Sequence, residues 1–186
     1  QNNTLLAFAP VFTDASSVAH HERSFSYFAD SLHRGITENN FSPLPNSEKE
    51  VEQIAKIVPS NGNHQILLRE NATKENLYQT ITKQPYQFVH IATHGLVNYK
   101  IPKLSALACY ETNSEAPNSS LFYANEAQML ELQADLVVLS SCESGIGRLM
   151  QGEGLIALNR SFMYAGAKNV LFSLWKVSDK HSSQLM

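Results

Sequence analysis

Short apolar runs and segments of helical periodicity alternate along most of the chain. The apolar runs are rich in Leu, Ile and Val and are bounded by turn-forming residues, which is typical of buried strands. Strands are predicted at 5–8, 65–68, 88–93, 104–111, 136–139 and 169–174, and helices at 47–58, 73–81, 125–132, 154–165 and from 178 onward. Strand alternating with helix predicts an α/β fold with a mostly parallel sheet and helices on both faces.

Local signals mark several helix ends. Ser47 and Glu50 have the spacing of a capping box, and Thr73 and Ser178 precede further helical segments. Gly166 follows the last periodic residue of its helix, where glycine is a common terminator.

Length and composition fit one globular domain over 1–186. Apolar residues make up 43% and charged residues 17% of the 186 residues. The formal net charge is −3 and no long basic run occurs, which disfavours nucleic acid and membrane surfaces as partners. The polar segment 16–35 has mixed patterning and is interpreted as a surface insertion.

No targeting or membrane segment is predicted. Apolar runs fall short of the ~18 residues of a spanning helix, and the amino terminus lacks the basic start of a signal peptide. A cytoplasmic location is therefore expected. Because the chain begins with Gln1 and stops at Met186, soon after a helix start, we expect it to be a piece of a longer protein, truncated in its last helix.

Two strands are followed by reactive side chains. Cys142 comes after the apolar run 136–139, and His94 with Gly95 comes after 88–93, about 50 residues earlier. Parallel neighbouring strands would place both at one edge of the sheet, where open α/β folds bind ligands. An imidazole in reach can deprotonate a thiol, and the N–H groups of Gly95 and Cys142 can form an oxyanion hole.

Several motifs together resemble the CHAT domain, a caspase-like cysteine peptidase family related to separases and often found with tetratricopeptide repeats. The motifs are HIATHG, LVVLSSCESGIG, GEGLIALNRSFMYAGAKNVLFSLW and KVSD. The resemblance implies a caspase-like three-layer sandwich with a sheet of about six strands. It also implies His94 and Cys142 as the catalytic dyad, a protein or peptide substrate, and a tetratricopeptide-repeat domain in the parent chain.

The resemblance also suggests a specificity pocket. SSCESG replaces the Gln-Ala-Cys-Arg-Gly type of segment of caspases, so aspartate specificity is not expected. Related separases cut after arginine and carry a Trp-x-Val-x-Asp segment that Trp175 to Asp179 resembles. By that analogy Asp179 pairs with a basic substrate side chain, and Ser173 and Trp175 are walls of the pocket.

Other reactive residues have structural interpretations. Cys109 has apolar neighbours and is expected to be a buried structural thiol. His90 and His94 lie ~13 Å apart along a strand at ~3.3 Å per residue, too far to chelate one ion, so His90 is interpreted as a core histidine. No metal or cofactor is predicted.

These observations predict a cysteine endopeptidase regulated by an adjacent domain or a partner, with the loops at 96–103 and 143–153 ordered on activation. The alternative from another class is a noncatalytic caspase-like interaction module. A third interpretation is a thiol acyltransferase or amidase, but Ser140 occupies the place of the first glycine in the Gly-x-Cys-x-Gly elbow.

Overall fold

The computed structural model describes residues 4–12, 43–59, 63–98, 101–110, 120–143, 153–173 and 178–186, with the backbone alone at 142–143 and 153–155. The strands are β1 (Leu5–Ala9), β2 (Gln65–Leu68), β3 (Phe88–Leu96), β4 (Ala106–Ala108), β5 (Leu121–Tyr123), β6 (Leu136–Glu143) and β7 (Val170–Phe172). The helices are α2 (Pro45–Ile57), α3 (Lys74–Lys83), α4 (Ala124–Ala127), α5 (Glu153–Tyr164) and α6 (Asp179–Leu185), with short 3₁₀ turns η1 (Arg69–Asn71) and η2 (Pro102–Leu104).

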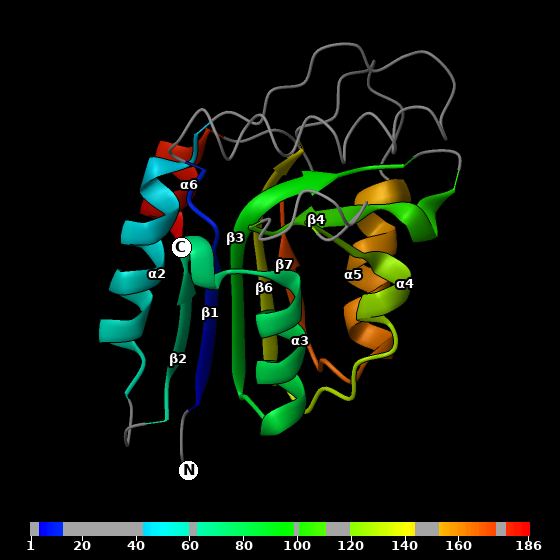
Figure 1. Ribbon diagram of the computed structural model, residues 1–186, viewed down its shortest axis with the longest axis horizontal. Helices are drawn as coiled ribbons and strands as arrows, with labels where there is room; N and C mark the ends of the chain where they lie inside the picture. The colour runs from blue at the N-terminus through cyan, green and yellow to red at the C-terminus, as the bar shows by residue number, and fades with distance from the viewer. Residues whose placement is uncertain are drawn as a thin grey trace.

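Five strands form a parallel sheet in the order β2, β1, β3, β6 and β7 (Figure 1). In Figure 1 these strands run upward from the bottom of the view, so their carboxyl ends lie at the same edge of the sheet. The strand β4 pairs antiparallel with the end of β3, and β5 pairs antiparallel with β4, which completes a seven-stranded sheet. The prediction of a mostly parallel sheet is confirmed.

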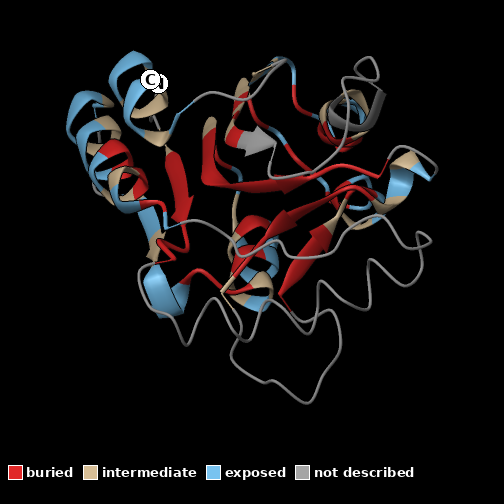
Figure 2. Ribbon diagram, turned by 90° about the horizontal axis from the view of Figure 1, so that it is seen from above, coloured by how far each residue is buried: buried red, intermediate tan, exposed pale blue. Residues whose placement is uncertain are grey.

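Both faces of the sheet are covered, because alternate residues of β1 enter different cores. Leu6 and Phe8 belong to a cluster with residues of α3 and α5, whereas Leu5 and Ala7 pack with Val51 of α2. All five residues of β1 are buried, as Figure 2 shows in red for much of the sheet. Helices α2 and α6 contact β3 and β6, respectively. The predicted α/β sandwich with helices on both faces is thus confirmed.

Most predicted strands and helices occur at the expected positions. The strand at 65–68 is β2 within its predicted bounds, and Thr73 caps α3 by accepting a hydrogen bond from the Asn76 N–H at 3.0 Å. Ser178 is likewise the N-cap of α6. Gly166 follows α5 with φ +111°, and a Cβ there would lie 2.1 Å from the Leu132 carbonyl oxygen, so only glycine fits.

The predicted capping box at the start of α2 was wrong. The helix begins at Pro45, before Ser47, because proline is already set for the first helical position. The Ser47 hydroxyl donates back to the Leu44 carbonyl at 2.7 Å, and Glu50 points to His90 instead of to the helix start.

Several boundaries differ in the second half of the chain. The strand predicted at 136–139 runs on as β6 to Glu143 and so includes Cys142. The helix predicted at 125–132 has four residues, Ala124 to Ala127, and β5 directly before it was not predicted. The strand predicted to end before His94 runs on to Leu96, because Gly95 and Leu96 pair with β4.

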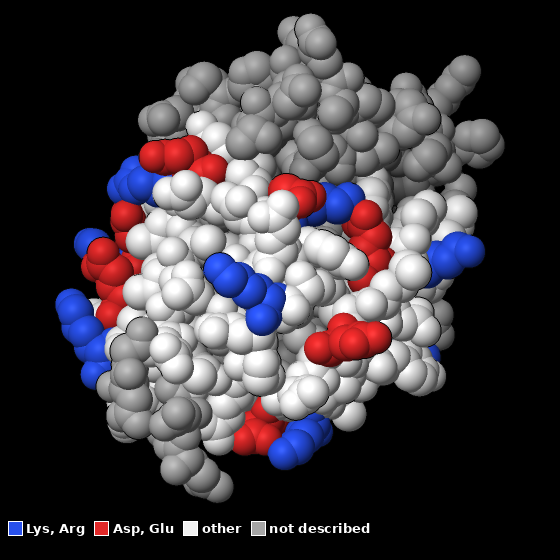
Figure 3. All heavy atoms as spheres, turned by 60° about the horizontal axis from the view of Figure 1, so that its bottom comes forward, with Lys and Arg blue, Asp and Glu red and all other residues white. Residues whose placement is uncertain are grey.

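The predicted insertion at 16–35 lies outside the described residues. Across the ranges that the structure does describe, none of the helices has the length and apolar character needed to cross a bilayer. On the face drawn in Figure 3, acidic and basic side chains are interspersed and do not gather by sign.

Candidate active site

The centre of the site is the pairing of β3 with β6. In this parallel ladder His94 is the register partner of Cys142, and Gly95 is the partner of Glu143. Neighbouring strands lie about 4.8 Å apart, so the backbones that carry the two residues are direct neighbours. The structure therefore brings together the two predicted dyad residues, although the Cys142 side chain is outside the description.

The imidazole of His94 is enclosed. The residue is 2% exposed, and its ring centroid lies 5.2 Å from that of Phe12, with an angle of 37° between the rings. Phe12 follows β1 and is itself 1% exposed. A buried aromatic neighbour limits rotation of the histidine ring and excludes water from one side of it.

Gly95 has pairing partners on both sides. It lies opposite Leu107 of β4 and Glu143 of β6, at the point where the antiparallel and parallel parts of the sheet meet. Its role in an oxyanion hole, like that of the Cys142 N–H, stays a prediction.

The predicted pocket residues have different surroundings. Ser173 is half-buried after β7, and its hydroxyl donates to the Ser141 carbonyl at 3.0 Å, so it lies beside the residue that precedes Cys142. Trp175 lies outside the described residues.

Asp179 begins helix α6, and its carboxylate points to helix α2. Its Oδ2 accepts a hydrogen bond from the Asn46 backbone N–H at 3.0 Å and another from Asn46 Nδ2 at 2.7 Å. A basic substrate side chain at this carboxylate would share it with Asn46. The assignment of Asp179 to substrate recognition stays a prediction.

A buried polar pair lies behind the site. His90 Nε2 and Glu50 Oε1 are 2.7 Å apart, with side chains 4% and 2% exposed. The interpretation of His90 as a satisfied core histidine is confirmed. Sequence reasoning missed Glu50 as its partner, although a glutamate next to Val51 on the apolar face of a helix needs a buried partner and was a usable signal.

The other cysteine is structural, as predicted. Cys109 is fully buried in the large core cluster, and its Sγ lies 3.9 Å from the Leu107 carbonyl oxygen. Burial raises the pKa of the Cys109 thiol far above its usual value, which suppresses the reactive thiolate. Within the described ranges, no three His, Cys, Asp or Glu side chains are grouped so that they could hold a metal ion.

The mostly parallel sheet with helices on both faces is consistent with a caspase-like sandwich, and His94 and Cys142 are in register on its adjacent strands β3 and β6. The chain belongs to the CHAT-domain family, since the model of that family, described as CHAT domain, matches residues 5–186.

Two similar proteins carry the same name. The chain is 29% identical over 169 residues to tetratricopeptide repeat protein 28 of Mus musculus, and 27% identical over 169 residues to that of Homo sapiens. Each match covers 74% of this chain but 6% of the relative. The relatives are therefore repeat proteins by name, and the chain corresponds to a small part of their length.

Proposed function

We propose that the chain is a cysteine endopeptidase domain in which His94 and Cys142 form the catalytic dyad. The observation that supports this most is the in-register pairing of these two residues on β3 and β6. The membership of the chain in a caspase-like family points to the same chemistry.

In the proposed reaction, the thiol proton of Cys142 passes to a ring nitrogen of His94, and the sulfur attacks the scissile carbonyl carbon. The carbonyl electron pair moves to oxygen, and the N–H groups of Gly95 and Cys142 stabilise that oxyanion. The C–N bond then breaks, and His94 returns the proton to the leaving amine, which leaves a thioester. His94 next deprotonates a water molecule, which hydrolyses the thioester and restores the thiol.

The proposed substrate is a protein or peptide with a basic residue before the cleaved bond. Asp179 supplies the carboxylate, and Ser173 and Trp175 supply walls of the pocket. The position of Ser173 beside Ser141 supports its part, because that carbonyl directly precedes Cys142.

Regulation by an adjoining tetratricopeptide-repeat domain is the second part of the proposal. The repeat proteins among the relatives support it. The loops expected to be ordered on activation, 96–103 and 143–153, lie partly outside the described residues. In this proposal the repeat domain acts on those loops and the protein is cytoplasmic.

The decisive experiment is cleavage of a diverse fluorogenic peptide library by the full-length parent protein and its variants. Cys142→Ala and His94→Ala are each expected to lower kcat/KM by about 10³-fold or more, because the first removes the nucleophile and the second removes its base. Cys109→Ala, at the structural cysteine, is the matched control and should keep the activity. Equal cleavage by the wild type and Cys142→Ala would refute the peptidase assignment.

The second candidate function is a noncatalytic interaction module. The names of the two relatives favour it, since they refer to repeats and not to a catalytic activity. A catalytic thiol should react with iodoacetamide at neutral pH much faster than Cys109, whereas a scaffold predicts two sluggish thiols. Rapid, His94-dependent alkylation of Cys142 would reject the scaffold.

A further inference from the structure

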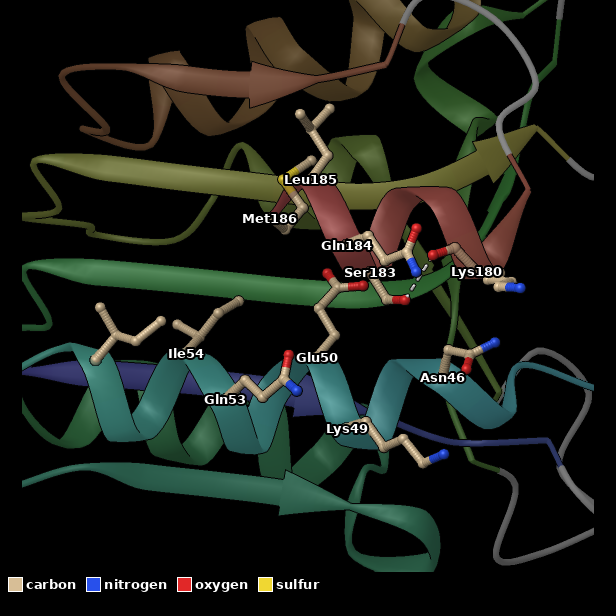
Figure 4. A pocket seen from close by; sticks show the side chains of 11 residues that line it. Asn46, Lys49, Glu50, Gln53, Ile54, Lys180, Ser183, Gln184, Leu185 and Met186 are labelled. Carbon is tan, nitrogen blue, oxygen red and sulfur yellow. Dashed lines mark hydrogen bonds between the residues drawn. The ribbon is translucent and has the colours of Figure 1, made fainter.

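Helices α2 and α6 lie side by side over the face of the sheet that holds His90. A groove of about 560 Å³ lies between them and is lined by residues of both helices (Figure 4). Asn46 and Lys180 lie at one end of the groove, and Ile54 and Met186 lie farther along it. The two helices are in contact, and hydrogen bonds join the first turn of α2 to the first residue of α6.

The first contact is a helix cap supplied from far along the chain. The N-cap residue of α2 is Leu44, whose side chain makes no capping hydrogen bond. Asp179 takes over this role by accepting hydrogen bonds from the Asn46 backbone N–H and from Asn46 Nδ2. A carboxylate at a helix amino terminus also interacts favourably with the helix dipole. The capping carboxylate thus fastens α6 to the first turn of α2.

The second contact joins α2 to β3. Glu50 lies on the buried side of α2, and its Oε1 is 2.7 Å from Nε2 of His90. His90 precedes His94 on the same strand. Breaking a buried pair of this kind leaves a polar group unsatisfied, so the contact resists displacement of α2 from the strand.

The third contact joins α6 to β6. The hydroxyl groups of Ser140 and Ser182 share a hydrogen bond of 3.1 Å. Ser140 is the register partner of Ala92 and lies shortly before Cys142 in the same strand. Together with the β3–β6 ladder, these contacts close a ring that runs from β6 through α6 and α2 to β3.

We propose that Asp179 is a positioning residue that fixes the relative placement of His94 and Cys142 through this ring. The inference rests on the proposed dyad of His94 and Cys142, and it gives the Asp179 carboxylate a second role, as the cap of α2, beside the proposed contact with substrate. The β3–β6 ladder holds the two backbones in register, so the release of Asp179 from Asn46 acts on the strand ends: α6 shifts with Ser182 and the end of β6, while α2 stays with His90 and β3. The distance between the thiol and its base then varies, and displacements of this kind reduce proton transfer steeply.

Two substitutions at one position separate the two roles of Asp179. Asp179→Asn keeps an oxygen that can accept both hydrogen bonds but removes the charge, and Asp179→Ala removes both. The measurements are the pH profile of Cys142 alkylation, made in a Cys109→Ala background of the full-length parent, and the kcat and KM for the best peptide. Lys180→Ala, an exposed position on the same helix, is the matched control.

Positioning predicts that Asp179→Ala lowers kcat by about tenfold with little change in KM and shifts the alkylation profile. Asp179→Asn should have a kcat and an alkylation profile close to those of the wild type. Lys180→Ala should leave kcat and the profile unchanged. Ser182→Ala, at the other end of the ring, should change the profile in the same direction as Asp179→Ala. If circular dichroism shows that Asp179→Ala is unfolded, Ser182→Ala is used in its place.

Positioning would be overturned in favour of substrate recognition if Asp179→Asn and Asp179→Ala lost the same activity and only the KM for basic peptides rose. Unchanged alkylation profiles in all variants would also overturn it. The alkylation profile needs no peptidase activity, so it tests positioning even if the parent protein cuts no peptide, and failure of the two proposals can be told apart.

Discussion

Asp135, directly before β6, has its two carboxylate oxygens held by different residues. Oδ1 lies 2.6 Å from Lys168 Nζ, and Oδ2 accepts a hydrogen bond from Gln87 at 2.7 Å. These contacts, first that with Lys168 and then that with Gln87, hold the pKa of Asp135 below its ordinary value of 3.8. A carboxylate with a lowered folded-state pKa stabilises the fold above its unfolded pKa and loses that effect as the pH falls through the folded value.

Asp135→Asn should therefore lower the free energy of unfolding at pH 6 and have a smaller effect near pH 3. The measurement is the urea midpoint of both proteins at the two pH values. In a Lys168→Ala background the effect of Asp135→Asn should shrink at pH 6, because the main cause of the lowered pKa is gone. An Asp135→Asn effect of equal size at both pH values would contradict this account.

At the scale of elements, the buried pair of Glu50 and His90 stabilises the packing of α2 against β3. Glu50→Ala leaves the imidazole of His90 buried without its partner, and we expect a loss of about 1–3 kcal/mol in the free energy of unfolding. Glu50→Gln retains a hydrogen-bonding oxygen and should cost less. Urea unfolding monitored by circular dichroism measures both.

Glu52→Ala is the control for this prediction, because Glu52 is an exposed position of the same helix. It should change the free energy of unfolding by less than about 0.5 kcal/mol. Equal costs for Glu52→Ala and Glu50→Ala would mean that helix propensity, and not the pair with His90, determines the effect.

Sequence predicted elements well where the determining interactions are local. Thr73 and Asn76 lie within one turn of each other, so the start of α3 could be predicted from the chain. The strand β5 has three residues and is fixed by pairing with β4, which no periodicity reveals. The cap of α2 comes from Asp179, so a local capping signal at Ser47 was misleading.

The site follows the same rule. The residue types and their places directly after apolar runs made His94 and Cys142 candidates for the dyad, because both features are local. That β3 and β6 are neighbours in register depends on the topology of the whole sheet, which alternation of strands and helices leaves open. The partners of Asp179 and His90 lie on α2, far away in sequence. The place of Glu50 beside Val51 indicated that it needs a buried partner, but the sequence could not show that this partner is His90.

At the scale of the whole molecule, Cys109 reports on the integrity of the larger core. It packs in one cluster with residues of β1, β3, α3 and α5, and is 0% exposed. Because local opening of one element would leave the other layers around it, we expect the thiol to react only when the entire fold opens.

In a Cys142→Ala background, the rate at which a thiol reagent labels Cys109 should rise with urea concentration. The rise should be proportional to the equilibrium constant for unfolding. The measurement is the labelling rate below the unfolding transition, compared with the slope of the free energy of unfolding against urea. A labelling rate that does not change with urea would show a local route to the thiol and would contradict a cooperative core.

The ladder between β3 and β6 also determines which sequence changes a lineage of such proteins can tolerate. Since backbone pairing sets His94 opposite Cys142, the connections between these strands can lengthen or shorten without altering the register of the pair. A single-residue insertion inside either strand has a different outcome, because it would set Ser141 or Glu143 opposite the histidine and turn the following side chains to the other face. We therefore expect insertions and deletions among related chains to accumulate in the connections and to be absent from these two strands.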